Sequence, residues 1–340
     1  MTQSNMNAPV QDAVTAQDET KGLSLGKIVW GRFVRHKAAM ICAVVLAITI
    51  FVVLTSIGVG PIPGWWMWSP TDIDPRIQNG GRPTLAFNGL IPTFGDHPFG
   101  QDQIGRDVFA RTMRGAQVSL LVMVLMGIIA TAVGVVIGAI AGFYRGKLDN
   151  VLMRFTEVII AIPTIVVTAV IGKVFGSSNP ALFGIVLGLL LWPGLARLVR
   201  AEYLSLRERE FVDAARVAGA DDRSIIFRHI LPNSIGVVIV NATLLMATAT
   251  ILEAALSFLG FGIQSPNVSL GQLINEYQTS FSTRPWLFWW PGFFIIVYAL
   301  TINLIGDGLR DAFDPRQRRI PKTKELKKQA IAKVETEVAQ

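Results

Sequence analysis

The chain has 340 residues, of which 51% are hydrophobic and 16% charged, and its mean hydropathy is +0.47. A soluble domain carries about 25% charged residues, so this composition excludes an ordinary soluble protein. The net charge of +7 does not indicate nucleic-acid binding, because the basic residues lie between and beyond long apolar runs, as they do in membrane proteins. The only cysteine, Cys42, lies inside an apolar run, which excludes a disulfide framework within the chain.

The first 20 residues are polar, and no apolar signal-peptide core lies near the start. The first apolar run begins at Ala38, directly after the basic residues Lys27, Arg32, Arg35 and Lys37. This order predicts an uncleaved first helix whose amino-terminal end stays in the cytoplasm.

A membrane-spanning helix needs about 20 apolar residues, and six segments meet this requirement. The third and fourth are separated by the turn residues 176–180, and the fifth is long enough to contain a break near Gly260. The six predicted spans are 38–58, 117–142, 152–175, 181–200, 232–260 and 287–307.

The distribution of Lys and Arg supports placing both termini in the cytoplasm. With six spans in this orientation, 24 of the 31 Lys and Arg residues lie on the cytoplasmic side and seven on the outer side. An excess of this kind is the signature of cytoplasmic loops. The basic tail after Arg316 is expected to lie near anionic membrane lipid.

The first outer loop, about 59–115, is the largest segment outside the predicted spans. Its tryptophans, Trp65, Trp66 and Trp68, are interpreted as an interfacial belt, and an aromatic ligand-binding box is the alternative. The stretch Val108 to Ser119 is amphipathic and is expected to form an interfacial helix.

Small residues recur at four-residue spacing in the second span and predict close packing against another helix. They are Ala130, Gly134, Gly138 and Gly142, with Gly184 and Gly188 repeating the pattern in the fourth span. We interpret the ionisable residues within the spans as structural, the alternative being a proton relay. Glu157 is expected to pair with Arg154. Glu253, in the outer half of the fifth span, is expected either to pair with another helix or to extend toward the membrane interface.

No motif for catalysis, for nucleotide binding or for a metal site occurs in the chain. Gly146-Lys147 and Gly172-Lys173 lack both the upstream glycine and the following Ser or Thr of a phosphate-binding loop. The three histidines are far apart, and there is no zinc-binding pattern and no GxSxG motif. We therefore expect a chain without enzymatic activity, cofactor or metal, whose energy source lies elsewhere.

The segment 202–233 is a charged, helix-favouring run between two predicted spans. Seven arginines lie between Arg197 and Arg228, and the topology places the segment in the cytoplasm. Ordinary loops are short and rich in turn residues. We therefore interpret this segment as a docking element for a partner.

Within that segment, Phe211 to Ala220 followed by His229-Ile230-Leu231-Pro232-Asn233 resembles the EAA loop of bacterial ABC-importer permeases. Asp213 stands where that motif has Glu, and Ile230 directly precedes the Leu-Pro pair. Three further stretches are similar to the dipeptide/oligopeptide/nickel permeases of the DppC/OppC group. They are 97–108 (HPFGQDQIGRDV), 256–262 (LSFLGFG) and 306–316 (GDGLRDAFDPR), and the resemblance covers about 95–315.

The resemblance implies an all-α integral membrane protein: a six-helix bundle of the type I ABC importer kind with a cytoplasmic coupling helix. It implies a homologous second permease, two cytoplasmic ATPases that bind the ATP, and an extracytoplasmic solute-binding protein. The expected organisation is a cytoplasmic tail (1–36), a first span with its outer loop (37–116), the core domain (117–308, coupling loop 201–231) and a basic tail (309–340). The residues expected to contact the ATPase are Phe211, Asp213, Ala214, Ala215, Gly219, Ala220 and Asp222.

In this interpretation Phe211, Ala214 and Ala215 form an apolar ridge, and Gly219 ends the helix. The expected function is import of short peptides across the bacterial inner membrane, and nickel or another small solute is the alternative cargo. An ion-coupled secondary transporter would be expected to show inverted repeats, and no clear internal repeat is present. A membrane scaffold without transport activity is the third possibility.

Overall fold

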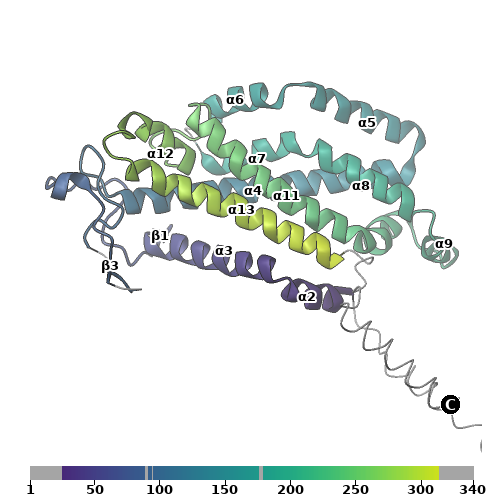
Figure 1. The fold of residues 1–340 in the computed structure, drawn as a ribbon. Helices are drawn as coiled ribbons and strands as arrows, with labels where there is room; N and C mark the ends of the chain where they lie inside the picture. The colour runs from purple at the N-terminus through teal and green to yellow at the C-terminus, as the bar shows by residue number, and fades with distance from the viewer. Residues whose placement is uncertain (1–24, 89–90, 94, 176–178, 314–340) are drawn as a thin grey trace, which may run out of the picture.

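The computed structural model describes residues 25–88, 91–93, 95–175 and 179–313. Most of the predicted amino-terminal tail, most of the basic tail with its predicted lipid contact, and the turn at 176–178 lie outside the described residues. The helices run along the long axis of the molecule, with a loop-rich cap at one end and the short helix α9 at the other (Figure 1).

The helical elements follow one another with short connections. In chain order they are α2 (Leu25–Arg35), α3 (Lys37–Ser56), α4 (Val108–Tyr144), α5 (Gly146–Ala161), α6 (Thr164–Phe175), α7 (Pro180–Leu191), α8 (Pro193–Leu206), α9 (Glu210–Val217), α10 (Asp222–Ser224), the π-helical turn η2 (Ile225–Ile230), α11 (Leu231–Phe258), α12 (Leu270–Tyr277), η3 (Gln278–Ser280) and α13 (Trp286–Phe313).

Six membrane spans fit these helices. Four are single apolar helices, namely α3, α4, α13 and the continuous helix from Asp222 to Phe258 that contains α11. The other two are the bent pairs α5–α6 and α7–α8, which are long and apolar enough only when each pair is taken together. All six predicted segments therefore coincide with helices, although two of them are broken.

Proline explains both breaks. Pro163 and Pro193 lack the backbone N–H that would continue the helix, and the residue before a proline avoids the helical conformation. Ile162 is accordingly extended, and α5 and α6 meet at 77°. Trp192 keeps a helical backbone conformation before Pro193, and the bend between α7 and α8 is 47°. The predicted break near Gly260 lies just after α11, which ends at Phe258.

The stretch Val108 to Ser119 does not form a separate interfacial helix. It is the beginning of α4, a single helix of 37 residues. Its polar side chains Arg111, Thr112 and Gln117 are buried. Arg111 pairs with α12, and Gln117 donates to the carbonyl of Val53 in α3 and to that of Gly58 just after α3. The amphipathic pattern was therefore read correctly as helical, but its polar face meets protein rather than the membrane surface.

The predicted close packing of small residues is confirmed. A side chain at Gly138 would place its Cβ 2.5 Å from the carbonyl oxygen of Ala196 in α8, and one at Gly188 would lie 2.9 Å from that of Met126 in α4. Contacts this short leave no room for a larger residue. The helices α4, α7 and α8 thus pack closely against one another.

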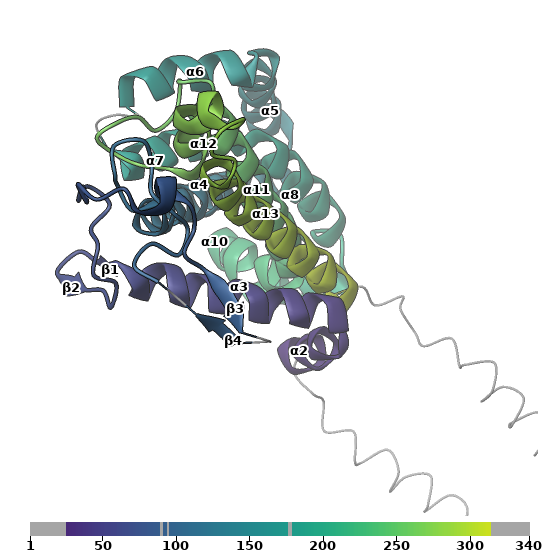
Figure 2. The same cartoon turned by 60° about the vertical axis from the view of Figure 1, so that its left-hand side comes forward.

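The cap is the segment between α3 and α4, and it contains two small antiparallel hairpins (Figure 2). The first pairs β1 (Gly58–Val59) with β2 (Ile62–Pro63), and the second pairs β3 (Ala86–Asn88) with β4 (Ile91–Thr93). The short turn η1 (Gln78–Gly81) lies between them. Trp65 is 61% exposed, as an interfacial residue would be. Trp66 instead packs on Phe109 and Trp68 on His97, so these two rings support the cap from within.

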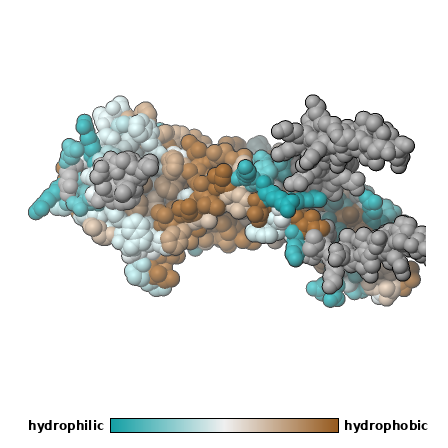
Figure 3. Space-filling model, turned by 60° about the horizontal axis from the view of Figure 1, so that its bottom comes forward, coloured by the Kyte–Doolittle hydropathy of each residue, from teal (hydrophilic) through white to brown (hydrophobic). Residues whose placement is uncertain are grey.

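The surface divides into an apolar middle and polar ends. On the face shown in Figure 3, hydrophobic residues form a central band, and hydrophilic residues gather toward both ends. This division is the one that a bilayer requires of a protein that crosses it.

Candidate functional site

The predicted coupling helix is α9, at the end of the molecule opposite the cap (Figure 1). The helix begins after Arg209, whose backbone is extended, and ends at the predicted terminator Gly219, which has φ +83°. The Gly219 amide donates to the Arg216 carbonyl, and the Ala220 amide donates to the Ala215 carbonyl, at 2.9 and 3.0 Å. This pair of bonds is the Schellman motif, which favours glycine at the left-handed position.

One face of α9 packs on the rest of the chain. Val212 is fully buried and Ala215 is 9% exposed. Both belong to an apolar cluster that includes Ile225, Ile226 and Ile230 of η2. Burial of this face fixes the rotation of α9 and thereby determines which residues point outward.

The outward face differs from the predicted ridge in one residue. Phe211 is 37% exposed, and Ala214 is also exposed. Ala215 is not part of this face, because it lies one helical turn after the buried Val212 and points in the same direction. Val217 was not predicted, yet it is 91% exposed.

The remaining predicted contact residues lie around this edge. Asp213, Gly219 and Asp222 are exposed, and Ala220 is partly buried. Asp213 accepts a hydrogen bond from Arg216 at 3.1 Å. The structure thus brings six of the seven predicted residues to one end of the chain with solvent access, and their role in contacting an ATPase stays a prediction.

Polar contacts join η2 and α8, the elements next to α9, to each other and to α4 and α5. The Tyr203 hydroxyl of α8 donates to the Ile226 carbonyl of η2 at 3.1 Å. Arg207 donates to the Phe143 carbonyl at the end of α4, and Arg200 of α8 donates twice to Asp149 of α5, at 2.6 and 2.7 Å. These contacts join η2, which packs against α9, to α8, and they join α8 and its end to α4 and α5.

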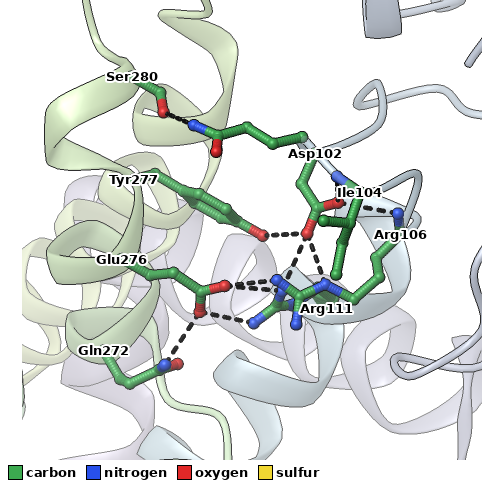
Figure 4. Close-up of polar contacts among 9 residues, drawn as sticks. Asp102, Ile104, Arg106, Arg111, Gln272, Glu276, Tyr277 and Ser280 are labelled. Atoms are coloured by element: carbon green, nitrogen blue, oxygen red, sulfur yellow. Dashed lines mark hydrogen bonds and ion pairs between the residues drawn. The ribbon is translucent and has the colours of Figure 1, made fainter.

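A second polar cluster joins the cap to α4 and α12 (Figure 4). Arg111 donates to both carboxylate oxygens of Glu276, at 3.0 and 2.7 Å, and to Asp102 at 3.1 Å. Arg106 bridges the same two carboxylates, with distances of 2.6 Å to Asp102 and 2.5 Å to Glu276. The Tyr277 hydroxyl completes the cluster with a 3.4 Å contact to Asp102.

The electrostatics of this cluster favour the charged state of Glu276. Burial raises the pKa of Glu276, but the hydrogen bond and charge of Arg111 and the charge of Arg106 outweigh burial, so the pKa lies below its ordinary value. The charges of the two arginines balance those of the two carboxylates. We interpret the cluster as a structural contact that holds the cap, α4 and α12 together.

His97 forms a second polar group inside the cap. Its Nδ1 lies 2.9 Å from Asp107 Oδ1 and its Nε2 lies 3.4 Å from Asp74 Oδ2, and the ring is 1% exposed. Burial lowers the pKa of His97, but the hydrogen bonds and charges of Asp107 and Asp74 outweigh burial and raise it. Asp107 also accepts the Ala110 amide at 2.7 Å, which caps the start of α4.

The predicted Arg154–Glu157 pair is present, and Glu253 has partners that were not predicted. Arg154 donates to Glu157 at 2.8 Å. Glu253 is 1% exposed and accepts hydrogen bonds from Ser119 of α4 and Ser257 of α11, both at 2.8 Å. The two serine hydroxyls in turn accept hydrogen bonds from backbone amides that follow α11: Ser257 from the Ile263 amide and Ser119 from the Leu270 amide at the start of α12.

The motif at 97–108 was predicted as a family feature, but the network of ion pairs between this motif, α4 and α12 was not. Asp102, Arg106 and Asp107 lie in that motif, whereas Glu276 is 170 residues from Arg106 and lies in a helix that was not predicted. The available signal was the high density of charged residues in 102–114, next to a predicted span.

Comparison with known proteins identifies the family. The family of binding-protein-dependent transport system inner membrane components matches residues 134–319, more than half of the chain. The chain belongs to this family. Residues 24–83 match a second family, the N-terminal transmembrane domain of oligopeptide transport permease C. The protein is therefore a mostly helical permease of an ABC importer in the inner membrane, and its family assembles with an ATPase and a binding protein.

Similar proteins cover most of the chain. A protein of Brucella ovis, provisionally named a peptide permease protein, is 42% identical over 287 residues, which are 84% of this chain and 89% of the relative. The oligopeptide transport system permease protein OppC of Haemophilus influenzae is 37% identical over 300 residues, 88% of this chain and 91% of the relative. The OppC protein of Mycobacterium tuberculosis is 35% identical over 303 residues, which are 88% of this chain and 98% of the relative.

A solved structure of the MetNI methionine ABC transporter, in inward-facing conformations, is also similar to this chain. The TM-score is 0.47 and the sequence identity 17%, and the match covers 61% of this chain and 97% of the other.

Proposed function

We propose that this chain is one of two homologous permease subunits of an ATP-driven importer and forms half of the translocation path for short peptides. Relatives with 35–42% identity that are named for peptide or oligopeptide transport support this cargo. Two cytoplasmic ATPase subunits bind and hydrolyse the ATP, and an extracytoplasmic binding protein delivers the peptide at the cap. This chain itself is non-catalytic and carries no cofactor.

In this proposal the end that holds α9 and both termini lie in the cytoplasm. The distribution of 24 of the 31 Lys and Arg residues supports this orientation, because basic residues are retained on the cytoplasmic side. The opposite end, with the hairpins and α12, then faces the binding protein.

The observation that carries the proposal is the exposed edge of α9. Val217, Phe211 and Ala214 form an apolar edge at the tip of the molecule, on a helix whose buried face packs in one apolar cluster with residues of α4, α8 and η2. Burial of an exposed valine or phenylalanine side chain contributes about 1.5–3 kcal/mol. An ATPase that covers this edge can therefore move α9 and the spans attached to it together.

Reconstitution of the complete complex tests this function. The chain, its partner permease, the ATPases and the binding protein are placed in vesicles, and uptake of labelled di- and oligopeptides is measured with and without ATP. We expect ATP-dependent peptide uptake, with no uptake when the ATPases are omitted. Uptake of nickel in preference to peptide would contradict the proposed cargo, and uptake driven by an ion gradient alone would contradict the proposed energy source.

A further inference from the structure

The break between α5 and α6 leaves backbone groups without partners. Ile162 has φ −80° and ψ 128°, and its carbonyl accepts no hydrogen bond from any part of the chain that the structure describes. Pro163 has no N–H to donate. The amides of Val166 and Val167 both donate to the Pro163 carbonyl, at 3.0 and 3.3 Å, and so leave the Ile162 carbonyl unpaired.

This break lies on the surface of the chain. All six residues from 160 to 165 are exposed, including Ile160 and Ile162 at 45% each and Ile165 at 54%. The comparable break between α7 and α8 is enclosed by protein, and Trp192 within it is 3% exposed. The two bent spans therefore place their irregular backbone in different surroundings.

An exposed break at this depth is incompatible with a lipid-facing surface. The break lies about midway along the α5–α6 pair, which extends over most of the length of the bundle (Figure 1). Hydrocarbon offers no hydrogen bonds, so non-helical backbone at membrane depth occurs only where protein buries it or where it borders a water-filled cavity.

Charged side chains on the same pair of helices support this conclusion. The side chain of Glu157, five residues before the break at Ile162, is 47% exposed and forms an ion pair with Arg154. Such residues are costly against lipid and face a bundle interior or a water-filled cavity. In contrast, α3 has no charged residue after Lys37, and its exposed large side chains, such as Ile48, are apolar.

We propose that the segment Ile160–Ile165 borders the water-filled translocation path, and that the free carbonyl of Ile162 accepts hydrogen bonds from backbone N–H groups of the passing peptide. Backbone N–H groups occur in peptides of nearly every sequence, so a carbonyl acceptor suits a path without strong sequence preference. The apolar side chains of Ile160 and Ile165 flank this acceptor. The inference rests on the proposed function of peptide import.

Cysteine labelling of the assembled complex tests the inference. Cys42 is the only cysteine of the chain, so Cys42→Ala gives a cysteine-free background. Ile162→Cys is introduced at the break. The matched control, Ile48→Cys, replaces the same residue type near the middle of α3, where the native side chain is 58% exposed. The label is a charged, membrane-impermeant thiol reagent, which reacts with the thiolate and therefore needs water at the site.

We expect Ile162→Cys to react at least tenfold faster than Ile48→Cys, and trialanine, used as the peptide probe, to slow the reaction severalfold. A lipid-soluble maleimide should label Ile48→Cys, which verifies that this site is exposed to lipid. If Ile162→Cys does not assemble, Ile165→Cys replaces it, because this residue lies in the first turn of α6 on the same exposed segment.

Equal, slow labelling of both variants by the charged reagent would overturn the inference when the complex still imports peptide. Fast labelling that trialanine leaves unchanged, in a complex that imports trialanine, would overturn the peptide contact. Failure of the unmodified complex to import any peptide would contradict the proposed function instead, and the labelling rates would still show whether water reaches the break.

Discussion

Arg111 of α4 and Glu276 of α12 form a two-pronged ion pair, with the closest contact 2.7 Å between Arg111 Nη2 and Glu276 Oε2. The Arg111 side chain is 3% exposed and that of Glu276 29%. Paired hydrogen bonds of this geometry fix orientation as well as distance. The contact holds α12, and the segment that follows α11, against the beginning of α4.

Replacing Arg111 with Met is expected to destabilise the cap end of the protein by about 3 kcal/mol, because it removes the buried cation that pairs with Glu276 and Asp102. Arg106 alone then remains to balance both carboxylates. The measurement is thermal or denaturant unfolding of the purified complex. Arg114→Met is the matched control on the same helix, since Arg114 is exposed, and its effect should stay below about 1 kcal/mol.

A double variant that removes both Arg111 and Glu276 tests whether these two residues act as a pair. In Arg111→Met combined with Glu276→Met, no carboxylate at 276 is left uncompensated, so the double variant should be more stable than the sum of the two single effects. Strict additivity would show that the two residues do not act as a pair.

The buried His97 predicts that the cap is less stable at alkaline pH. Because Asp107 and Asp74 raise the pKa of His97 in the folded protein, the stabilising charge is fully present below about pH 6.5, the value in the unfolded chain. The stabilisation is lost as the pH rises through the higher pKa of the folded state. We expect the unfolding temperature to fall on this alkaline side, and limited proteolysis of the cap to become faster.

His97→Gln should remove this component of the pH dependence. His229→Gln is the matched control, because it removes an imidazole from η2, at the opposite end of the molecule. Stability profiles of His97→Gln and the unmodified protein that coincide between pH 6 and pH 9 would contradict the assignment.

The sequence predicted the features that follow from local rules. Spans follow from apolar length, the packing face around Gly138 from four-residue spacing, and the end of α9 from the left-handed preference of Gly219. The Arg111–Glu276 pair could not be predicted, because it joins residues 165 positions apart. The rotation of α9 could not be predicted either: only its docking on η2 decides that Ala215 points inward and Val217 outward.

Val217→Asp is expected to weaken binding of the ATPase about tenfold to a hundredfold. Burying a valine contributes about 1.5–3 kcal/mol, and every 1.4 kcal/mol changes affinity tenfold. The measurement is the affinity of the ATPase subunit for the purified permease pair, together with peptide uptake. Leu148→Asp is the control, because Leu148 is a 44% exposed apolar residue at the same end but outside α9. Equal loss in both variants would contradict docking through α9.

Gly219→Glu is expected to uncouple ATP hydrolysis from transport while the chain still inserts into the membrane. A Cβ atom at this position would meet nothing within 4 Å apart from its chain neighbours, so the obstacle is the backbone conformation with φ +83°. A left-handed conformation costs an ordinary residue about 1–2 kcal/mol, which is enough to distort the end of α9. The measurement is the ratio of peptide uptake to ATP hydrolysed, with membrane flotation as the check on insertion.

Two controls separate the backbone effect of Gly219→Glu from its charge. Ala218→Glu places the same charge one residue earlier, at an exposed position with φ −74°, and should retain most of the coupling. Gly219→Asn should also retain it, because asparagine tolerates the left-handed conformation better than other residues with a side chain. If Ala218→Glu uncouples the transporter as strongly as Gly219→Glu, the added charge is the cause, and the role of the Gly219 conformation in coupling is refuted.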